Sequence, residues 1–204
     1  MANFDRLAEL GKALFLQHDQ KTILQRLHLK SDLERIYVPF CGECFSVNRN
    51  TGDVLDGSGN PAGPAATLII FDMLCFTQKE VKLSGEWRTT GMLPGSGQSS
   101  PDDVLLNSRL TRRFEEHTAE LEEACRSLGG MRFPVGDVAW EIPIFPWFPA
   151  VFQFWLGDDE FPSSARLLWD RDALQYFHFE TLFYIMGHVF QKLDGMIEKR
   201  RKNP

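Results

Sequence analysis

The sequence lacks the features that would place it in a special class of protein. It has only four cysteines in 204 residues, at uneven spacings, which excludes the dense disulfide framework of a small secreted domain. Its longest apolar run, residues 65–76, is interrupted by Asp72 and is shorter than the roughly 20 residues that cross a bilayer. The first ten residues contain charges and no apolar signal segment. We therefore expect a cytoplasmic protein with reduced thiols and no contact with a membrane.

Positive charge is also in deficit. Lys and Arg number 22 against 28 Asp and Glu, which gives a formal net charge of −6. Such a balance provides no broad cationic surface, so we expect no nucleic-acid partner. Apolar residues at 43% and charged residues at 25% are ordinary for a globular chain, and this length can bury its own core. We expect a single domain over residues 1–204.

Hydrophobic periodicity predicts both helices and strands in the N-terminal half. Leucines at three- and four-residue steps predict an amphipathic helix from residue 3 to about 29, with a break near residues 18–21. Alternating apolar side chains over residues 36–47 predict a hairpin, and residues 48–52 (NRNTG) have the composition of a turn. The apolar segment 64–76 is expected to form a helix that is covered on nearly all sides.

The middle of the chain combines a loop with a helix. Residues 85–101 are rich in glycine and proline around Trp87, which predicts a long irregular loop. Pro101-Asp102-Asp103 then begins an apolar pattern at helical spacing, which Gly129-Gly130 closes. We expect one helix over this segment, with His117 on its apolar seam.

The C-terminal third predicts a meander of three strands and a final helix. The helix is expected from Leu174 to about Lys199, and a basic tail at residues 199–204 suits a helix C-terminus. Together with the N-terminal hairpin, this pattern predicts an α+β fold in which an antiparallel sheet of about five strands is packed by three to four helices. The alternating runs of the meander lie at residues 138–144, 152–156 and 165–169.

Cys41 and Cys44 form the most distinctive short motif, CGEC. Two thiolates at this spacing can bind zinc or iron, or form a redox pair. A metal site needs two further ligands, and Cys75, Cys125 and the histidines are available. Residues three apart on a continuous strand point to opposite faces, so convergence requires a turn at Gly42-Glu43. The alternative is two thiols that only pack.

The five histidines are scattered and form no metal-binding motif of their own. His117 and His178 are the candidates for metal ligation or proton transfer, and the alternative for His117 is a hydrogen-bonded core histidine. His178 and His188 are separated by about 80° around a helix and nearly three turns along it, so they cannot chelate one ion unaided. The candidate metal ligands are therefore Cys41, Cys44, His117 and His178.

Acidic residues offer two further candidates. The run Asp158-Asp159-Glu160 could supply oxygen ligands to a hard cation, but its spacing is not that of an EF-hand, and the alternative is the solvated tip of a hairpin. Asp72 interrupts an apolar helix, where a carboxylate needs hydrogen bonds or a cation. We expect Arg88 or Arg166 as its structural partner, with a functional acid as the alternative.

Aromatic side chains crowd residues 140–155. They could line a pocket for a flat ligand or form a surface that binds a partner. Strand alternation points about half of them to each face, so packing in the core is the alternative. If they form a site together with the acidic run, its residues are Trp140, Trp147, Phe154, Trp155, Asp158, Asp159 and Glu160.

A long motif in the C-terminal third resembles a known family. It runs Phe154-Trp155-Leu156-Gly157-Asp158-Asp159-Glu160-Phe161-Pro162-Ser163-Ser164-Ala165, followed by Leu168-Trp169-Asp170. This segment resembles the bacterial and archaeal family catalogued as domain of unknown function 3786. The likeness extends more loosely upstream through Gly85-Glu86-Trp87 and the hairpin region 40–54, so it covers most of the chain.

The resemblance implies a setting rather than a reaction, because the family has no established activity. Its members are largely from anaerobes, and some carry an iron–sulfur domain also found in corrinoid proteins of one-carbon metabolism. The acidic turn 158–160 matches the family motif, whereas the family pattern does not ask for Cys41 or Cys44. We predict a non-catalytic accessory protein that binds a cofactor or a partner such as an iron–sulfur or corrinoid protein. The alternative is a metal-dependent enzyme or metal-binding protein that uses the acidic turn, the cysteines and the histidines.

Overall fold

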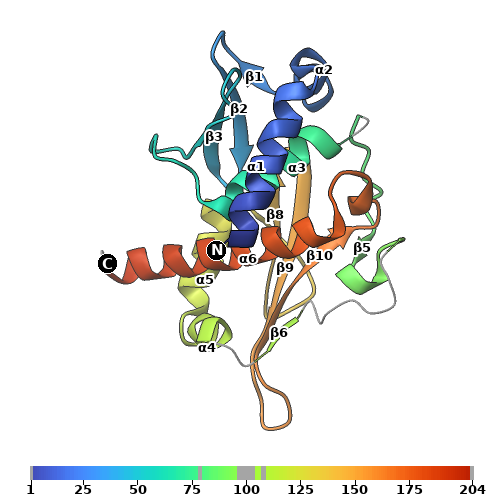
Figure 1. Ribbon diagram of the computed structural model, residues 1–204. Helices are drawn as coiled ribbons and strands as arrows, with labels where there is room; N and C mark the ends of the chain where they lie inside the picture. Colours follow the sequence, from blue (N-terminus) through green and yellow to red (C-terminus); the bar gives the residue numbers. More distant parts are fainter. Residues whose placement is uncertain (1, 78–79, 96–103, 107–108, 203–204) are drawn as a thin grey trace. The chain divides into compact units, whose positions relative to one another are not determined.

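The computed structural model describes residues 2–77, 80–95, 104–106 and 109–202 of the chain. Internal contacts divide the chain into two compact units, and Figure 1 labels most of the helices and strands of both. The first unit comprises Met1–Lys82 and Leu174–Tyr184, and the second comprises Leu83–Ala173 and Ile185–Pro204. The final helix α6 (Phe179–Lys202) contributes its first residues to the first unit and the remainder to the second.

Two helices begin the first unit, which confirms the predicted break near residue 18. Helix α1 (Ala2–Gln17) is followed by α2 (Gln20–Leu27). The Asp19 carboxylate caps α2 by accepting hydrogen bonds from the backbone N–H of Lys21 at 3.1 Å and the hydroxyl of Thr22 at 2.5 Å. The chain therefore turns where a capping residue satisfies the free N–H groups of the second helix.

A four-stranded antiparallel sheet follows, in the order β1-β2-β3-β4. The predicted hairpin is confirmed: Ile36 pairs with Val47 and Val38 pairs with Phe45, and all four side chains are buried. Cys41 and Gly42 form its turn with φ of 48° and 72°, the left-handed conformation that tight hairpin turns require. The strands are β1 (Lys30–Ser31), β2 (Arg35–Phe40), β3 (Glu43–Asn48) and β4 (Val54–Leu55).

Helix α3 (Pro64–Phe76) has one fully buried side and one half-buried side, so it is covered less completely than the predicted enclosure on nearly all sides. Gly11 lets α1 approach closely, because a Cβ atom at this position would lie 2.9 Å from the Cβ of Phe71. The buried side of α3 carries Ile69, Ile70, Met73 and Leu74. The opposite side has half-buried residues, which are Leu68, Asp72, Cys75 and Phe76.

The second unit is built on a six-stranded antiparallel sheet. The main order is β5-β10-β9-β8-β7, and β6 also pairs with β10. The α+β class and the predicted meander are confirmed, but the two hairpin regions lie in two separate sheets instead of one. The strands are β5 (Trp87–Arg88), β6 (Val104–Leu106), β7 (Met131–Arg132), β8 (Val138–Phe145), β9 (Phe148–Trp155) and β10 (Ser164–Asp170).

The single long helix predicted after residue 101 is wrong in two respects. Residues 104–106 form strand β6, because their backbone pairs with Ser164–Arg166 of β10, while residues 101–103 lie outside the described part of the chain. The helical segment that follows is divided into α4 (Arg109–Glu116) and α5 (Thr118–Ser127). His117 adopts φ −138° and ψ 49°, which no α-helix continues, so it lies between the helices instead of on one seam.

The core of the second unit is aromatic. The ring of Phe114 on α4 makes edge contacts with Phe152 and Phe154 on β9 and with Phe190 on α6, at centroid distances of 5.9 to 6.4 Å. Such contacts add to the burial of apolar area. Helix α6 begins five residues later than predicted, since residues 173–175 form a short 3₁₀ turn.

The predicted loop 85–101 is only partly described, as is the predicted basic tail 199–204, whose residues 203–204 lie outside the described part. Within the predicted loop 85–101, residues 90–92 form a 3₁₀ turn and residues 96–101 lie outside the described part. None of the helices in the described ranges combines the length and apolar character needed to span a membrane.

Candidate functional site

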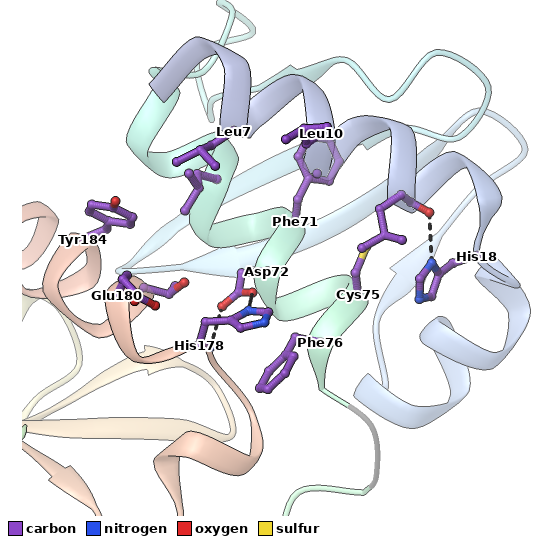
Figure 2. A pocket seen from close by; sticks show the side chains of 14 residues that line it. Leu7, Leu10, His18, Phe71, Asp72, Cys75, Phe76, His178, Glu180 and Tyr184 are labelled. Atoms are coloured by element: carbon purple, nitrogen blue, oxygen red, sulfur yellow. Dashed lines mark hydrogen bonds and ion pairs between the residues drawn. The ribbon is translucent and has the colours of Figure 1, made fainter. Parts of the chain in front are cut away.

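The first unit contains a cavity of about 590 Å³ whose walls come from α1, α3 and the beginning of α6 (Figure 2). Most of its surface is apolar. The α1 wall carries Leu7, Leu10 and Leu14, and the α3 wall carries Leu68, Phe71, Cys75 and Phe76. Asp72, His178 and Glu180 lie together where α6 begins and form the polar end of the cavity, whereas His18 lies apart from them at the end of α1.

The α1 wall is unusual because its leucines are exposed. Leu7, Leu10 and Leu14 are spaced by three and four residues, so they share one face of the helix. They remain 36%, 57% and 47% exposed, although each lines the cavity. A contiguous apolar patch of this kind is typical of a binding surface.

The polar end is organised by Asp72 and His178. The Asp72 carboxylate accepts the backbone N–H of His178 at 3.0 Å and the ring Nδ1 of His178 at 2.5 Å. Its side chain is only 10% exposed, whereas that of His178 is 58% exposed. The prediction of Arg88 or Arg166 as the partner of Asp72 is wrong, because His178 occupies both carboxylate oxygens, and Arg88 pairs with Glu86 at 2.9 Å instead. The partner of Asp72 is a histidine 106 residues further along the chain.

These contacts fix the chemistry of the histidine ring. A carboxylate oxygen only accepts, so His178 donates through Nδ1, and the Nε2 atom of the neutral ring is left as an acceptor. The ring also packs on Phe76, with a centroid distance of 3.9 Å (Figure 2). His18, at the end of α1, donates in the same way from Nδ1 to the carbonyl oxygen of Leu14 at 2.9 Å. Both histidines that line the cavity therefore have a fixed donor atom.

Cys75 lines the cavity but offers no thiolate. Burial, and to a lesser degree the Asp72 charge, raise its pKa to about 12, although the positive charge of Arg26 acts in the opposite direction. The thiol is therefore protonated at neutral pH and is a weak nucleophile and metal ligand.

The predicted aromatic site residues mostly pack within the second unit. Phe154 is fully buried, and Trp140 is 6% exposed between the guanidinium groups of Arg126 and Arg132, each 5.7 Å from its ring. Trp147 stacks on Phe145 at 5.5 Å, and Trp155 is half-buried. None of these four aromatic residues lines the cavity of the first unit.

The acidic turn is held by its own backbone. One carboxylate oxygen of Asp158 accepts the N–H groups of Glu160 at 2.8 Å and Phe161 at 2.7 Å, and these bonds lower the pKa of Asp158. Asp158, Asp159 and Glu160 are all exposed at the connection between β9 and β10. The geometry is that of a self-capped turn, and a ligand role for these residues stays a prediction.

The four predicted metal ligands lie in different surroundings. Cys41 is buried in the β2–β3 turn, Cys44 is exposed on β3, and His178 is held by Asp72. His117 belongs to the second unit, where its Nδ1 lies 3.9 Å from Glu120. Within the described ranges, no three or more His, Cys, Asp or Glu side chains are close enough to hold a metal ion. A metal role for the four residues stays a prediction.

A second hollow, of about 340 Å³, lies in the second unit and is lined by charged side chains. Its arginine nearest the protein interior, Arg113, is already paired with Asp194 at 3.0 Å and with Glu198. Arg113 is therefore already occupied by the protein's own carboxylates, and the hollow lacks the apolar lining of the cavity in the first unit.

Sequence reasoning found only part of the pocket. It identified His178 as a candidate and Asp72 as a carboxylate that needs a partner, but it did not pair them. The exposed leucines of α1 resemble any amphipathic helix face in sequence. Only the partial cover of α3 distinguishes them from core residues.

The fold defines an α+β protein with a ligand-sized cavity in its first unit. The chain belongs to the family described as a domain of unknown function (DUF3786), whose model matches residues 19–192. The match includes the α3 and α6 walls of the cavity and begins after α1. No curated protein and no solved structure matches the chain.

Proposed function

We propose that the protein is a binding protein for a small, largely apolar molecule, held in the cavity of the first unit without a catalytic step. One observation carries this proposal: Leu7, Leu10 and Leu14 form an exposed apolar stripe that faces a cavity of about 590 Å³. Cavities of roughly 300–1,000 Å³ with a mainly apolar lining and a few polar groups are typical of sites for small molecules.

Energetics support an occupant. Removing one large apolar side chain from water contributes roughly 1.5–3 kcal/mol, and three leucines here are only partly covered by their own unit. A molecule that covers this stripe gains part of that free energy. The polar end with Asp72 and His178 then gives the occupant one orientation.

The biological setting that we propose comes from the family resemblance. The family resemblance implies anaerobic one-carbon metabolism, with an iron–sulfur or corrinoid protein as the partner that the accessory protein would serve. This part depends on the resemblance alone. The alternative of a metal-dependent protein that uses residues 158–160, the cysteines and the histidines depends on the sequence patterns alone.

Titration with the neutral dye Nile red tests the proposal. Leu14→Ser removes part of the stripe, and we expect it to weaken dye binding by about three- to tenfold, which corresponds to roughly 1 kcal/mol of lost apolar contact. Leu16→Ser is the matched control, because Leu16 is 41% exposed on the same helix but does not line the cavity. The two positions lie about 200° apart around α1.

The outcomes are distinct. Dye binding that is weakened by Leu14→Ser and unchanged by Leu16→Ser supports the proposal. An absence of dye binding, or an equal effect of both variants, contradicts it. If the wild-type chain binds no dye and forms a dimer that Leu14→Ser dissociates, the stripe is an interface between two copies.

A further inference from the structure

We infer that the occupant of this cavity is an amphipathic molecule with a protonated amine as its head group, which contacts the Glu180 carboxylate and the Nε2 atom of His178. The inference rests on the proposed function and specifies the chemical class of ligand. It follows from the kinds of polar atoms that the cavity presents.

The polar end presents negative charge and mainly acceptors, because the hydroxyl groups of Thr181 and Tyr184, which also line the cavity, can accept as well as donate. Asp72 and Glu180 contribute two carboxylates, and the described lining includes no Lys or Arg. Because Nδ1 of His178 and Nδ1 of His18 both donate elsewhere, each neutral ring offers only an acceptor, at Nε2. A head group that supplies several donors and one positive charge satisfies these acceptors, whereas a carboxylate or phosphate would face like charge.

The start of α6 is the one feature that would favour an anion. Free N–H groups and the helix dipole at an N-terminus attract negative charge. Here that role is already filled, because the Asp72 carboxylate accepts the N–H of His178 immediately before the helix. Glu180 adds a second carboxylate in the first turn of α6. The protein itself therefore supplies negative charge at this helix start.

Arg26 is the cation that acts on Cys75 in the cavity wall. Its guanidinium donates to the carbonyl oxygen of Leu74 at 2.9 Å, which holds it at the end of α3, and Arg26 is not among the residues that line the cavity.

The two carboxylates have different roles. Asp72 is 10% exposed and both of its oxygens accept hydrogen bonds from His178, so it acts as a positioning residue for that ring. Glu180 is exposed in the first turn of α6 and is free to meet a head group directly. Removing the charge of Glu180 should therefore change ligand preference without disturbing the fold.

Displacement of bound Nile red by decylamine, decanol and decanoate at pH 7 tests the inference. The three probes share one apolar chain and differ in head-group charge. We expect decylamine to displace the dye at a concentration at least about tenfold lower than decanoate, because the carboxylates of the cavity attract its ammonium group and repel the carboxylate of decanoate. Glu180→Gln should reduce that preference about threefold or more.

A matched control separates the site from general attraction to an acidic chain. Glu34→Gln removes one exposed carboxylate of the same unit that does not line the cavity. If the chain's charge of −6 alone attracts the amine, Glu34→Gln and Glu180→Gln will reduce the preference equally, and the inference is wrong. Decanoate or decanol displacing the dye as well as decylamine does would also overturn it, while dye binding itself would still support the proposed function. An absence of dye binding overturns both.

Discussion

The two units treat apolar surface in opposite ways. In the second unit, Phe152 and Phe154 on β9 are completely buried against Phe114 of α4. In the first unit, α1 leaves Leu10 and Leu14 57% and 47% exposed along a cavity. The segment richest in aromatic residues is therefore packed, and a plain leucine stripe is the open surface. The candidate site is therefore distinguished by apolar side chains that remain exposed, more than by its content of aromatic residues.

The two units also differ in how they bind a well-buried carboxylate, Asp170 in the second unit and Asp72 in the first. Asp170 in the second unit is 1% exposed and accepts hydrogen bonds from the backbone N–H groups of Ser84, Gly85 and Asp172. Its partners are fixed backbone groups, so it holds a loop. Asp72 in the first unit is bound to a histidine that is itself 58% exposed. Asp170 therefore fixes the backbone of a loop, whereas Asp72 orients a histidine side chain that a ligand can reach.

The largest expected effect is a loss of stability in the aromatic core of the second unit. Phe114→Ala removes a ring that contacts three other phenylalanines, and we expect a loss of about 3–5 kcal/mol in the free energy of unfolding, measured by chemical denaturation. Phe161→Ala is the control, because that ring is 67% exposed and should change stability by less than about 0.5 kcal/mol. Equal losses in the two variants would show that the aromatic core is not closed as described.

An intermediate change in stability is expected where α1 packs against α3. Gly11→Ala places a Cβ atom 2.9 Å from the Cβ of Phe71, so α1 must move away from α3, at a cost of about 1–3 kcal/mol. Gly195→Ala in α6 meets no atom within 4 Å and should stabilise the protein by up to about 1 kcal/mol through helix propensity. Thermal unfolding of both variants checks the opposite signs. Stabilisation by Gly11→Ala would contradict the close approach of the two helices.

The smallest effect concerns the acidic turn. The pKa of Asp158 is lowered in the folded state by the N–H groups of Phe161 and Glu160, so its stabilising contribution is complete above the ordinary value of 3.8 and is lost as the pH falls through the lower folded-state pKa. Asn at this position keeps an acceptor oxygen but does not titrate. We expect the melting temperature of the wild-type protein to exceed that of Asp158→Asn by a small margin at neutral pH.

That margin should shrink as the pH is lowered below 3.8. Asp159→Asn serves as the control, because no hydrogen bond to the Asp159 side chain is seen among the described residues, and it should show no such pH dependence. A margin that is constant with pH would mean that the charge of Asp158 does not stabilise the turn, and a tightly bound cation there would make the effect of Asp158→Asn much larger.

Local patterns predicted the elements that depend on neighbours in sequence. The hairpin of β2 and β3, the meander of β8 to β10 and the break before Asp19 all follow from side-chain alternation or a capping residue. Residues 104–106 were predicted as helix because their apolar side chains fit both periods. These residues form a strand because their backbone pairs with β10, which lies 58 residues or more further along the chain.

The candidate site depended on distant contacts, so less of it was predictable. The sequence predicts that Asp72, a carboxylate in an apolar helix, needs a hydrogen-bonding partner. It does not identify His178 as that partner. The leucine spacing of α1 predicts an apolar face, but the same spacing arises whether the face is buried or open. Whether a helix face is buried or exposed depends on which other elements of the unit pack against it.

The most direct test of the central claim is a titration followed by methyl NMR of selectively labelled leucines, with decanol as a neutral ligand. The account predicts that the methyl resonances of Leu7, Leu10 and Leu14 shift progressively, while those of Leu16 and of Leu33, which is 92% exposed outside the cavity, stay in place. Unchanged resonances at the three cavity leucines, or equal shifts at Leu33, would contradict the claim that this cavity is the binding site.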